Sequence, residues 1–182
     1  MKKLSVLFTI LATLNLSSQQ LNESNFKDFM AARYIDANTI KYKNLDTLKV
    51  PFTILDYNDI NYVPALVNGV YDYFVFDTGC SYGLAINDTL FEKILKSGEV
   101  FEEDFIGSDI IQTAVGNFEI IKVFIIEKVV VGKPDESLEL NNVLMAVYDS
   151  KDGPLLLGQD IINRFSSITI DNKNQTYIFK KK

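Results

Sequence analysis

Two apolar runs on either side of Asn68-Gly69 constrain the fold of this chain more than any other feature. The first run covers residues 62–67 and the second covers residues 70–76. Asn and Gly both tolerate the positive φ angles of a two-residue hairpin turn, so the two runs are predicted to pair as antiparallel strands. Pro64 has no N–H to donate, which places its part of the first strand at an edge or a bulge. The sequence therefore predicts a β-hairpin over residues 62–76.

Short apolar runs separated by turn residues continue from Val50 to the end of the chain, which is typical of an all-β domain. Further strands are predicted at residues 118–131, 143–148, 155–157, 167–171 and 176–179. A short helix is predicted at 88–96, with Asp88 as its N-cap and Gly98 as its C-terminal stop. Its inward side chains would be Leu90, Phe91, Ile94 and Leu95. A second helical turn is expected at 161–165, capped by Asp160.

The N-terminus has the pattern of a secretory signal peptide, because Met1-Lys2-Lys3 precedes a short apolar stretch at residues 4–14. That stretch is too short for a stable membrane anchor, and the expected location is therefore periplasmic or secreted. The alternative is a buried N-terminal element of a cytosolic protein. The predicted division is a signal peptide at 1–18, an N-terminal extension at 19–48 and one domain at 49–182. A helix starting near Ser24 would place these side chains on one face: Phe26, Phe29, Met30 and Tyr34.

Composition excludes several kinds of chemistry. The chain has no histidine and one cysteine, so Ser-His-Asp, Cys-His and His-ligated zinc mechanisms are impossible. The net charge of −6, without a basic stripe, disfavours a nucleic-acid partner. Cys80 could serve as a nucleophile, but without a histidine to lower its pKa the favoured interpretation is a small buried residue after a tight turn. Carboxylates remain as the main groups for hydrolysis.

Asp77-Thr78-Gly79 directly follows the second strand of the predicted hairpin and precedes Cys80-Ser81. Partial burial of Asp77 would disfavour its charge, and a second carboxylate nearby would push one of the two toward the protonated form. Thr78 can hold the turn through its hydroxyl, Gly79 can donate its amide to the carboxylate, and Ser81 can bond the outer carboxylate oxygen. The tripeptide alone could also be a polar turn or part of a phosphate loop, but the chain has no glycine-rich loop.

With these motifs, residues 62–179 resemble a single-lobed, retroviral-type (retropepsin-like) aspartic peptidase of the kind found in bacterial exported proteins. Residues 76–81 match the family's hydrophobic-Asp-Thr-Gly-Ala-Ser turn, with Cys80 replacing the usual small residue. Residues 155–165 resemble its apolar-apolar-Gly element and the short helix beneath the catalytic turn, through Leu156, Leu157 and Gly158. The position of the family's flap is occupied by Thr113, Ala114, Val115 and Gly116. The resemblance implies a closed β-barrel with one or two short helices.

The resemblance also implies an aspartic endopeptidase that acts on peptide or protein substrates without a metal or an organic cofactor. Its mechanism needs two carboxylates, and this chain has a single Asp-Thr-Gly. Asp160 is the nearest imitation but lacks the Thr-Gly that should follow. The second carboxylate is therefore expected from Asp77 of another subunit, in a homodimer with a two-fold axis.

Several alternatives stay open at the level of sequence. The whole domain could be a non-catalytic peptide-binding or assembly β-barrel of the same fold, since a fold transfers more safely than an activity. Residues 113–117 could be an ordinary hairpin turn, and residues 155–158 an ordinary core strand. The N-terminal extension could serve packing or regulation, or could be a removable propeptide.

Overall fold

The structure is a computed structural model that describes residues 46–54, 59–98, 100, 104–133 and 136–182. The expected signal peptide at 1–18 and the helix expected from Ser24 lie outside these residues. Within the described ranges, no helix has the length and apolar character needed to cross a membrane.

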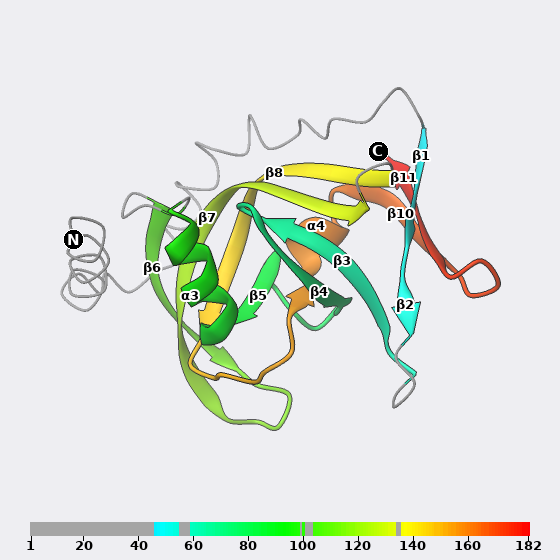
Figure 1. The fold of residues 1–182 in the computed structure, drawn as a ribbon. Helices are drawn as coiled ribbons and strands as arrows, with labels where there is room; N and C mark the ends of the chain where they lie inside the picture. The colour runs from blue at the N-terminus through cyan, green and yellow to red at the C-terminus, as the bar shows by residue number, and fades with distance from the viewer. Residues whose placement is uncertain (1–45, 55–58, 99, 101–103, 134–135) are drawn as a thin grey trace.

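Two β-sheets make up most of the described chain (Figure 1). The strands are β1 (Thr47–Pro51), β2 (Thr53–Ile54), β3 (Asn61–Val67), β4 (Val70–Phe76), β5 (Leu84–Asn87), β6 (Phe105–Gln112), β7 (Phe118–Lys133), β8 (Glu136–Tyr148), β9 (Leu156–Leu157), β10 (Phe165–Asp171) and β11 (Thr176–Lys181). The larger sheet has the order β2-β3-β4-β9-β5-β8-β7-β6, and β3 also pairs with β7. The smaller sheet has the order β1-β11-β10. The predicted predominance of β structure is confirmed.

The β3–β4 hairpin forms as predicted. Val67 pairs with Val70 across the turn, where Asn68 has a φ of 42° and Gly69 a φ of 77°. On its other side β3 pairs first with β2, at residues 61–62, and then with β7, at residues 65–67. Pro64 lies between these two pairings, so its missing N–H falls where β3 changes partner.

The first described helix, α3 (Asp88–Ser97), follows β5 and ends at Gly98, whose φ of 78° is left-handed as expected of a C-terminal glycine. Its buried side chains are the predicted ones: Leu90, Phe91, Ile94 and Leu95. The predicted N-cap is wrong, because Asn87 rather than Asp88 caps the helix. The Asn87 side-chain oxygen accepts from the backbone N of Leu90 at 2.9 Å, and its Nδ2 donates to the Gly153 carbonyl at 2.8 Å. This second hydrogen bond joins Asn87 to a loop that is distant in the sequence. It explains why Asn87 rather than Asp88 is the cap.

Replacing Asn87 with Ala is expected to lower the free energy of unfolding by about 1–2 kcal/mol. The helix loses its N-cap, and the Gly153 carbonyl loses its hydrogen-bond donor. Urea unfolding followed by circular dichroism measures this change. Asp88→Ala is the matched control and should cost about 1 kcal/mol or less, since it removes a first-turn carboxylate that lies beside the like-charged Asp149. A larger loss in Asp88→Ala than in Asn87→Ala would contradict this assignment of the cap.

Two further predictions are corrected near the C-terminus. The strand expected at 143–148 begins at Glu136, because it pairs with β7 from Lys133↔Glu136 to Lys122↔Val147. The helical turn expected at 161–165 is α4 (Gln159–Ile162), and Phe165 already begins β10. Asp160 lies within α4 and does not cap it. The N-cap residue is Gly158, so this helix has no side-chain cap.

Buried apolar side chains form two clusters. The larger lies between the two sheets and α3 and includes Phe74, Leu84, Ile94, Phe124 and Phe179. The smaller, here called the hairpin cluster, consists of Tyr82, Ala85, Ile121, Val123, Ile125, Leu144 and Ala146. Partly buried side chains that pack against the hairpin cluster are Cys80, Ile106, Ile111, Tyr148 and Leu156. This cluster therefore contacts both the segment after Asp77 and the β6–β7 hairpin.

Candidate active site

Asp77 is the first residue after β4, and β9 fixes its backbone. The two strands pair in parallel through Val75↔Leu156 and Phe76↔Leu157. The backbone N of Asp77 donates to the Leu157 carbonyl at 2.9 Å. Residues far apart in the sequence thus meet where β4 ends, and the apolar-apolar-Gly element predicted beneath the turn lies beside it.

Phe76 anchors the end of β4 from the other side. Its ring packs on Tyr177 and Phe179 of β11, with ring centroids 4.8 Å and 5.7 Å apart. Such tilted aromatic pairs add packing energy beyond the buried area alone. The smaller sheet therefore helps to hold the strand that carries Asp77.

The turn at 77–80 orients the Asp77 carboxylate. The Gly79 amide donates to Asp77 Oδ1 at 2.7 Å, and the Cys80 amide donates to the Asp77 carbonyl at 3.3 Å. A Cβ on Gly79 would lie 3.2 Å from Asp77 Oδ1, closer than nearly all such contacts. A short bond from a backbone amide to a carboxylate is charge-assisted, and it gives the side chain one preferred orientation.

Gly158 and Gln159 support the turn from below. A Cβ on Gly158 would lie 2.2 Å from the Tyr82 carbonyl oxygen and 2.5 Å from that of Cys80, so only glycine fits against these backbone atoms. Gln159 donates its backbone N to the Cys80 carbonyl and its Nε2 to the Thr78 carbonyl, both at 2.8 Å. Sequence reasoning missed Gln159, although its position directly after Leu-Leu-Leu-Gly was a usable indication.

Asp160 has a structural partner. Its Oδ2 lies 2.9 Å from Arg164 Nη2, and both side chains are only 7% exposed. Arg164 also donates to the carbonyls of Asn141 and Asn142, at 2.6 Å and 2.9 Å. The Asp160 carboxylate is therefore occupied in fixing α4 to β8 and is not placed as a second carboxylate for Asp77.

Thr78 and Ser81 lie on the surface of the turn. In the described part of the chain, neither hydroxyl takes part in a hydrogen bond, and Ser81 does not bond Asp77. Asp77 itself is partly exposed. The solvent-exposed side of the turn thus offers one carboxylate, that of Asp77, and the hydroxyls of Thr78 and Ser81 to a ligand.

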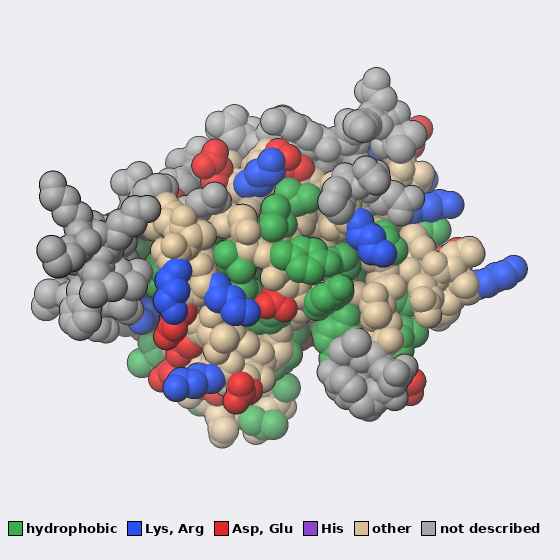
Figure 2. All heavy atoms as spheres, in the orientation of Figure 1, with side chains coloured by type: hydrophobic (Ala, Val, Ile, Leu, Met, Phe, Trp, Pro, Cys, Tyr) green, Lys and Arg blue, Asp and Glu red, His purple; other side chains and the backbone are tan. Residues whose placement is uncertain are grey.

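The predicted flap residues form the turn of the β6–β7 hairpin. The Thr113 amide donates to the Asn117 carbonyl and the Gly116 amide to the Thr113 carbonyl, both at 2.8 Å, and Gly116 has a φ of 88°. Beside the turn one face of the hairpin is apolar and exposed: Val115 is 82%, Phe118 73% and Ile120 70% exposed. Figure 2 shows hydrophobic side chains at the lower end of the molecule, where this hairpin lies. On the opposite face, Ile121 belongs to the hairpin cluster and Ile111 packs against it, as Cys80 does.

Cys80 is half-buried, and its Sγ lies 3.8 Å from the Tyr82 carbonyl oxygen. Burial, and to a lesser extent the negative charge of Asp77, raises the pKa of its thiol. Because the thiolate is the reactive form, Cys80 is expected to react with iodoacetamide at neutral pH severalfold more slowly in the folded chain than in urea. Mass spectrometry of the alkylated protein measures both rates. Faster reaction in the folded state would return Cys80 to the list of candidate nucleophiles.

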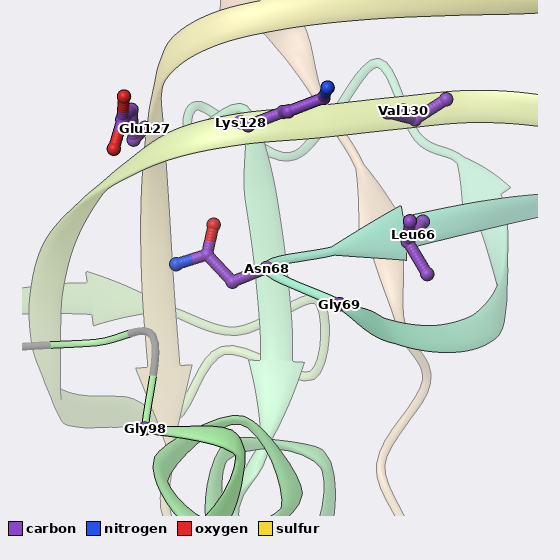
Figure 3. Close-up of a pocket in the computed structure, with 7 residues that line it drawn as sticks. All are labelled: Leu66, Asn68, Gly69, Gly98, Glu127, Lys128 and Val130. Carbon is purple, nitrogen blue, oxygen red and sulfur yellow. The ribbon is translucent and has the colours of Figure 1, made fainter.

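A cavity of about 310 Å³ lies elsewhere, between the β3–β4 turn, the C-terminal end of α3 and β7 (Figure 3). It is lined by Leu66, Asn68, Gly69, Gly98, Glu127, Lys128 and Val130. Its position at the opposite end of β4 separates it from Asp77 by roughly 20 Å of extended strand. Among the described residues no group of three His, Cys, Asp or Glu side chains is placed to hold a metal ion. The turn at Asp77 is therefore the candidate site.

The fold is retropepsin-like. The crystal structure of a retropepsin-like aspartic protease from Rickettsia conorii aligns with a TM-score of 0.51 and 21% sequence identity, over 78% of this chain and 96% of that one. The retroviral protease-like domain of Ddi1 from Leishmania major aligns with a TM-score of 0.40 and 19% identity, over 63% and 82% of the two chains. No protein-family model matches the sequence, and no curated protein matches it. The predicted retropepsin-like fold is thus confirmed, whereas its closure into a β-barrel stays a prediction. The activity has to be argued from the residues of the site.

Proposed function

We propose that this protein is an exported, homodimeric aspartic endopeptidase that hydrolyses peptide bonds with a water molecule activated between the Asp77 carboxylates of two subunits. The observation that carries the proposal is the Asp77 turn: a carboxylate oriented by the Gly79 amide and held by β9 and Gln159, in a retropepsin-like fold. Hydrolysis by carboxylates also agrees with a chain that contains no histidine.

The proposed reaction is general acid–base hydrolysis. One Asp77 carboxylate takes a proton from the bound water, and the water oxygen attacks the carbonyl carbon of the peptide bond. The protonated carboxyl of the other Asp77 gives its proton to the carbonyl oxygen. When the tetrahedral intermediate collapses, the first carboxyl gives the proton it took from water to the leaving nitrogen and the C–N bond breaks. The second carboxylate takes a proton from one hydroxyl of the intermediate, and the carbonyl forms again. Each round thus leaves one proton shared between the two carboxylates, as before.

A second subunit supplies the second carboxylate in this proposal. In the described chain Asp160 is held by Arg164, so it cannot complete the pair. A two-fold axis next to the turn would bring two copies of the same surface together. The exposed hydroxyl of Thr78 would then be free to bond the partner's turn, and Ser81 would face the space where the water and the substrate bind.

The β6–β7 hairpin is proposed as the flap over an extended peptide. Its exposed apolar side chains favour an apolar substrate segment or the partner's hairpin. The Thr113 hydroxyl oxygen is shielded from solvent and has no hydrogen-bond partner among the described residues; a small movement of the turn around a bound peptide would let the peptide backbone supply one. The pairing of β3 with β7, far along the order of the larger sheet, supports the closed β-barrel that the family resemblance implies.

Cleavage profiling of a mixed peptide library by mass spectrometry tests the activity. The chain is purified without the signal peptide expected at residues 1–18, and it is assayed from acidic to neutral pH beside its Asp77→Asn variant. The assay covers a range of protein concentrations. Specific activity that rises with concentration to a plateau, and that disappears in Asp77→Asn, supports a dimeric aspartic peptidase. Hydrolysis that survives Asp77→Asn overturns the proposal, and a well-folded dimer that cleaves nothing favours a peptide-binding or assembly module of the same fold.

A further inference from the structure

A buried tyrosine connects the turn at Asp77 with the β6–β7 hairpin. Tyr82 follows the turn closely in sequence and is 8% exposed, within the hairpin cluster. Its hydroxyl donates to Asp109 Oδ2 at 2.5 Å. Asp109 belongs to β6 and pairs with Ile121 of β7. The bond therefore joins the segment after the turn to the middle of the hairpin.

Both ends of this contact are fixed. The other oxygen of Asp109, Oδ1, accepts from the backbone N of Ile110 at 2.8 Å, so the carboxylate has a defined orientation. At the other end, the Tyr82 carbonyl lies against Gly158. The next residue, Gly83, donates its amide to the Leu144 carbonyl at 3.0 Å, and its carbonyl accepts from the Gly158 amide at 2.9 Å. Tyr82 cannot shift without disturbing the backbone beneath the turn.

The chemistry of the contact favours a strong bond. Burial, and then the bond to Asp109, raises the pKa of the Tyr82 hydroxyl, which keeps its proton and remains a donor. A hydroxyl that donates to a carboxylate forms a shorter and stronger bond than two neutral groups do. Nothing in the proposed hydrolysis uses either side chain, so the bond needs a different explanation.

We propose that Tyr82 is a positioning residue that sets the β6–β7 hairpin relative to the Asp77 turn through its hydrogen bond to Asp109. The consequence for catalysis rests on the proposed function, whereas the positioning itself does not. Ile121, as a member of the hairpin cluster, and Ile111, which packs against it, hold the inner face of the hairpin by apolar contacts that have no directional preference. The Tyr82–Asp109 hydrogen bond is directional, and it thereby fixes the distance between the hairpin and the Asp77 turn.

Amide hydrogen exchange of the full exported chain tests the positioning without reference to cleavage. Tyr82→Phe keeps the ring and removes the bond, and amide exchange in the β6–β7 hairpin is expected to become about tenfold faster. Exchange in β10 and β11 should stay unchanged. Tyr177→Phe is the matched control, because its hydroxyl accepts from Asn61 at 3.4 Å on another part of the molecule. Unchanged hairpin exchange in Tyr82→Phe, or equal acceleration in all strands, overturns the proposal.

Substitutions at Asp109 separate positioning from general packing. Asp109→Asn retains an acceptor oxygen and should keep most of the protection, whereas Asp109→Ala should lose at least as much as Tyr82→Phe, because it also removes the acceptor of the Ile110 amide. The double variant Tyr82→Phe/Asp109→Ala should be no worse than Asp109→Ala alone, because the Tyr82–Asp109 bond is already absent there. Fully additive effects would overturn the proposal.

Kinetics then test the consequence for catalysis. If the hairpin closes on the substrate, Tyr82→Phe should raise KM severalfold while changing kcat less, because the Asp77 carboxylates remain in place. An unchanged KM beside faster hairpin exchange would refute the catalytic consequence and leave the positioning established. If the wild-type chain cleaves nothing and Tyr82→Phe still shows faster hairpin exchange than the wild type, only the proposed function is refuted.

Discussion

Replacing Asp77 with Asn is expected to lower kcat/KM for peptide hydrolysis by on the order of a thousandfold. An amide can neither take a proton from water nor return one to the carbonyl oxygen. The fold should survive, because the carbonyl oxygen of Asn can accept the bond that the Gly79 amide now donates at 2.7 Å. Cleavage of one peptide selected from the library measures the loss, and thermal unfolding shows whether stability is retained.

Asp72→Asn is the control for this variant. Asp72 lies on the same strand, β4, and its carboxylate faces Lys93 at 3.5 Å on the surface. Its loss should leave hydrolysis unchanged, since exposed ion pairs of this kind contribute little. Equal losses in the two variants would mean that the Asp77 result reflects damage to β4.

Mixing wild-type and Asp77→Asn chains tests whether the two carboxylates come from two subunits. If a dimer needs both, only wild-type pairs are active, and an equal mixture should retain about one quarter of the activity of the same total amount of wild-type chain. Activity that falls in proportion to the wild-type fraction would show that each chain acts alone.

The second large effect is expected on stability, at the buried ion pair of Asp160 and Arg164. Arg164→Met should lower the free energy of unfolding by about 3–5 kcal/mol, because it leaves the Asp160 carboxylate buried without its partner. It also removes the donor to the carbonyls of Asn141 and Asn142. Urea unfolding at neutral pH measures the change.

The helix α3 provides a matched control with the same spacing. Lys96 and Glu92 form an exposed ion pair four residues apart, at 3.3 Å. Lys96→Met should cost about 0.5 kcal/mol or less, because solvent screens the pair. The double variant Asp160→Leu/Arg164→Met should regain part of the loss of Arg164→Met, since no unpaired charge remains. Similar losses at Lys96 and Arg164 would contradict the importance of burial.

Local chemistry explains which parts of the fold the sequence predicts. Asn68-Gly69 determines a hairpin because the two residues themselves supply the positive φ angles. Gly98 ends α3 for the same reason. The Asp77 turn and Leu156-Leu157-Gly158 were recognised because each motif is continuous in sequence. Their meeting through the bond from Asp77 to Leu157 became expected only through the resemblance to a known fold.

The errors arise where distant residues decide. Asn87 and Asp88 are both good caps, and the loop carbonyl of Gly153 favours Asn87. The beginning of β8 at Glu136 depends on pairing with β7, which continues past the polar residues Asn141 and Asn142. The Tyr82–Asp109 bond joins residues on different elements, so no pattern within either segment indicates it.

The two-residue pairing of β4 with β9 has a consequence for the order in which the protein matures. Asp77 is synthesised long before Leu157 and Gln159, which accept and donate the bonds that hold its turn. A ribosome must therefore complete most of the domain before the Asp77 turn is fixed to β9 and α4. Until then the turn lacks these two bonds, so a peptidase of the proposed kind would become competent only after most of its domain has been made.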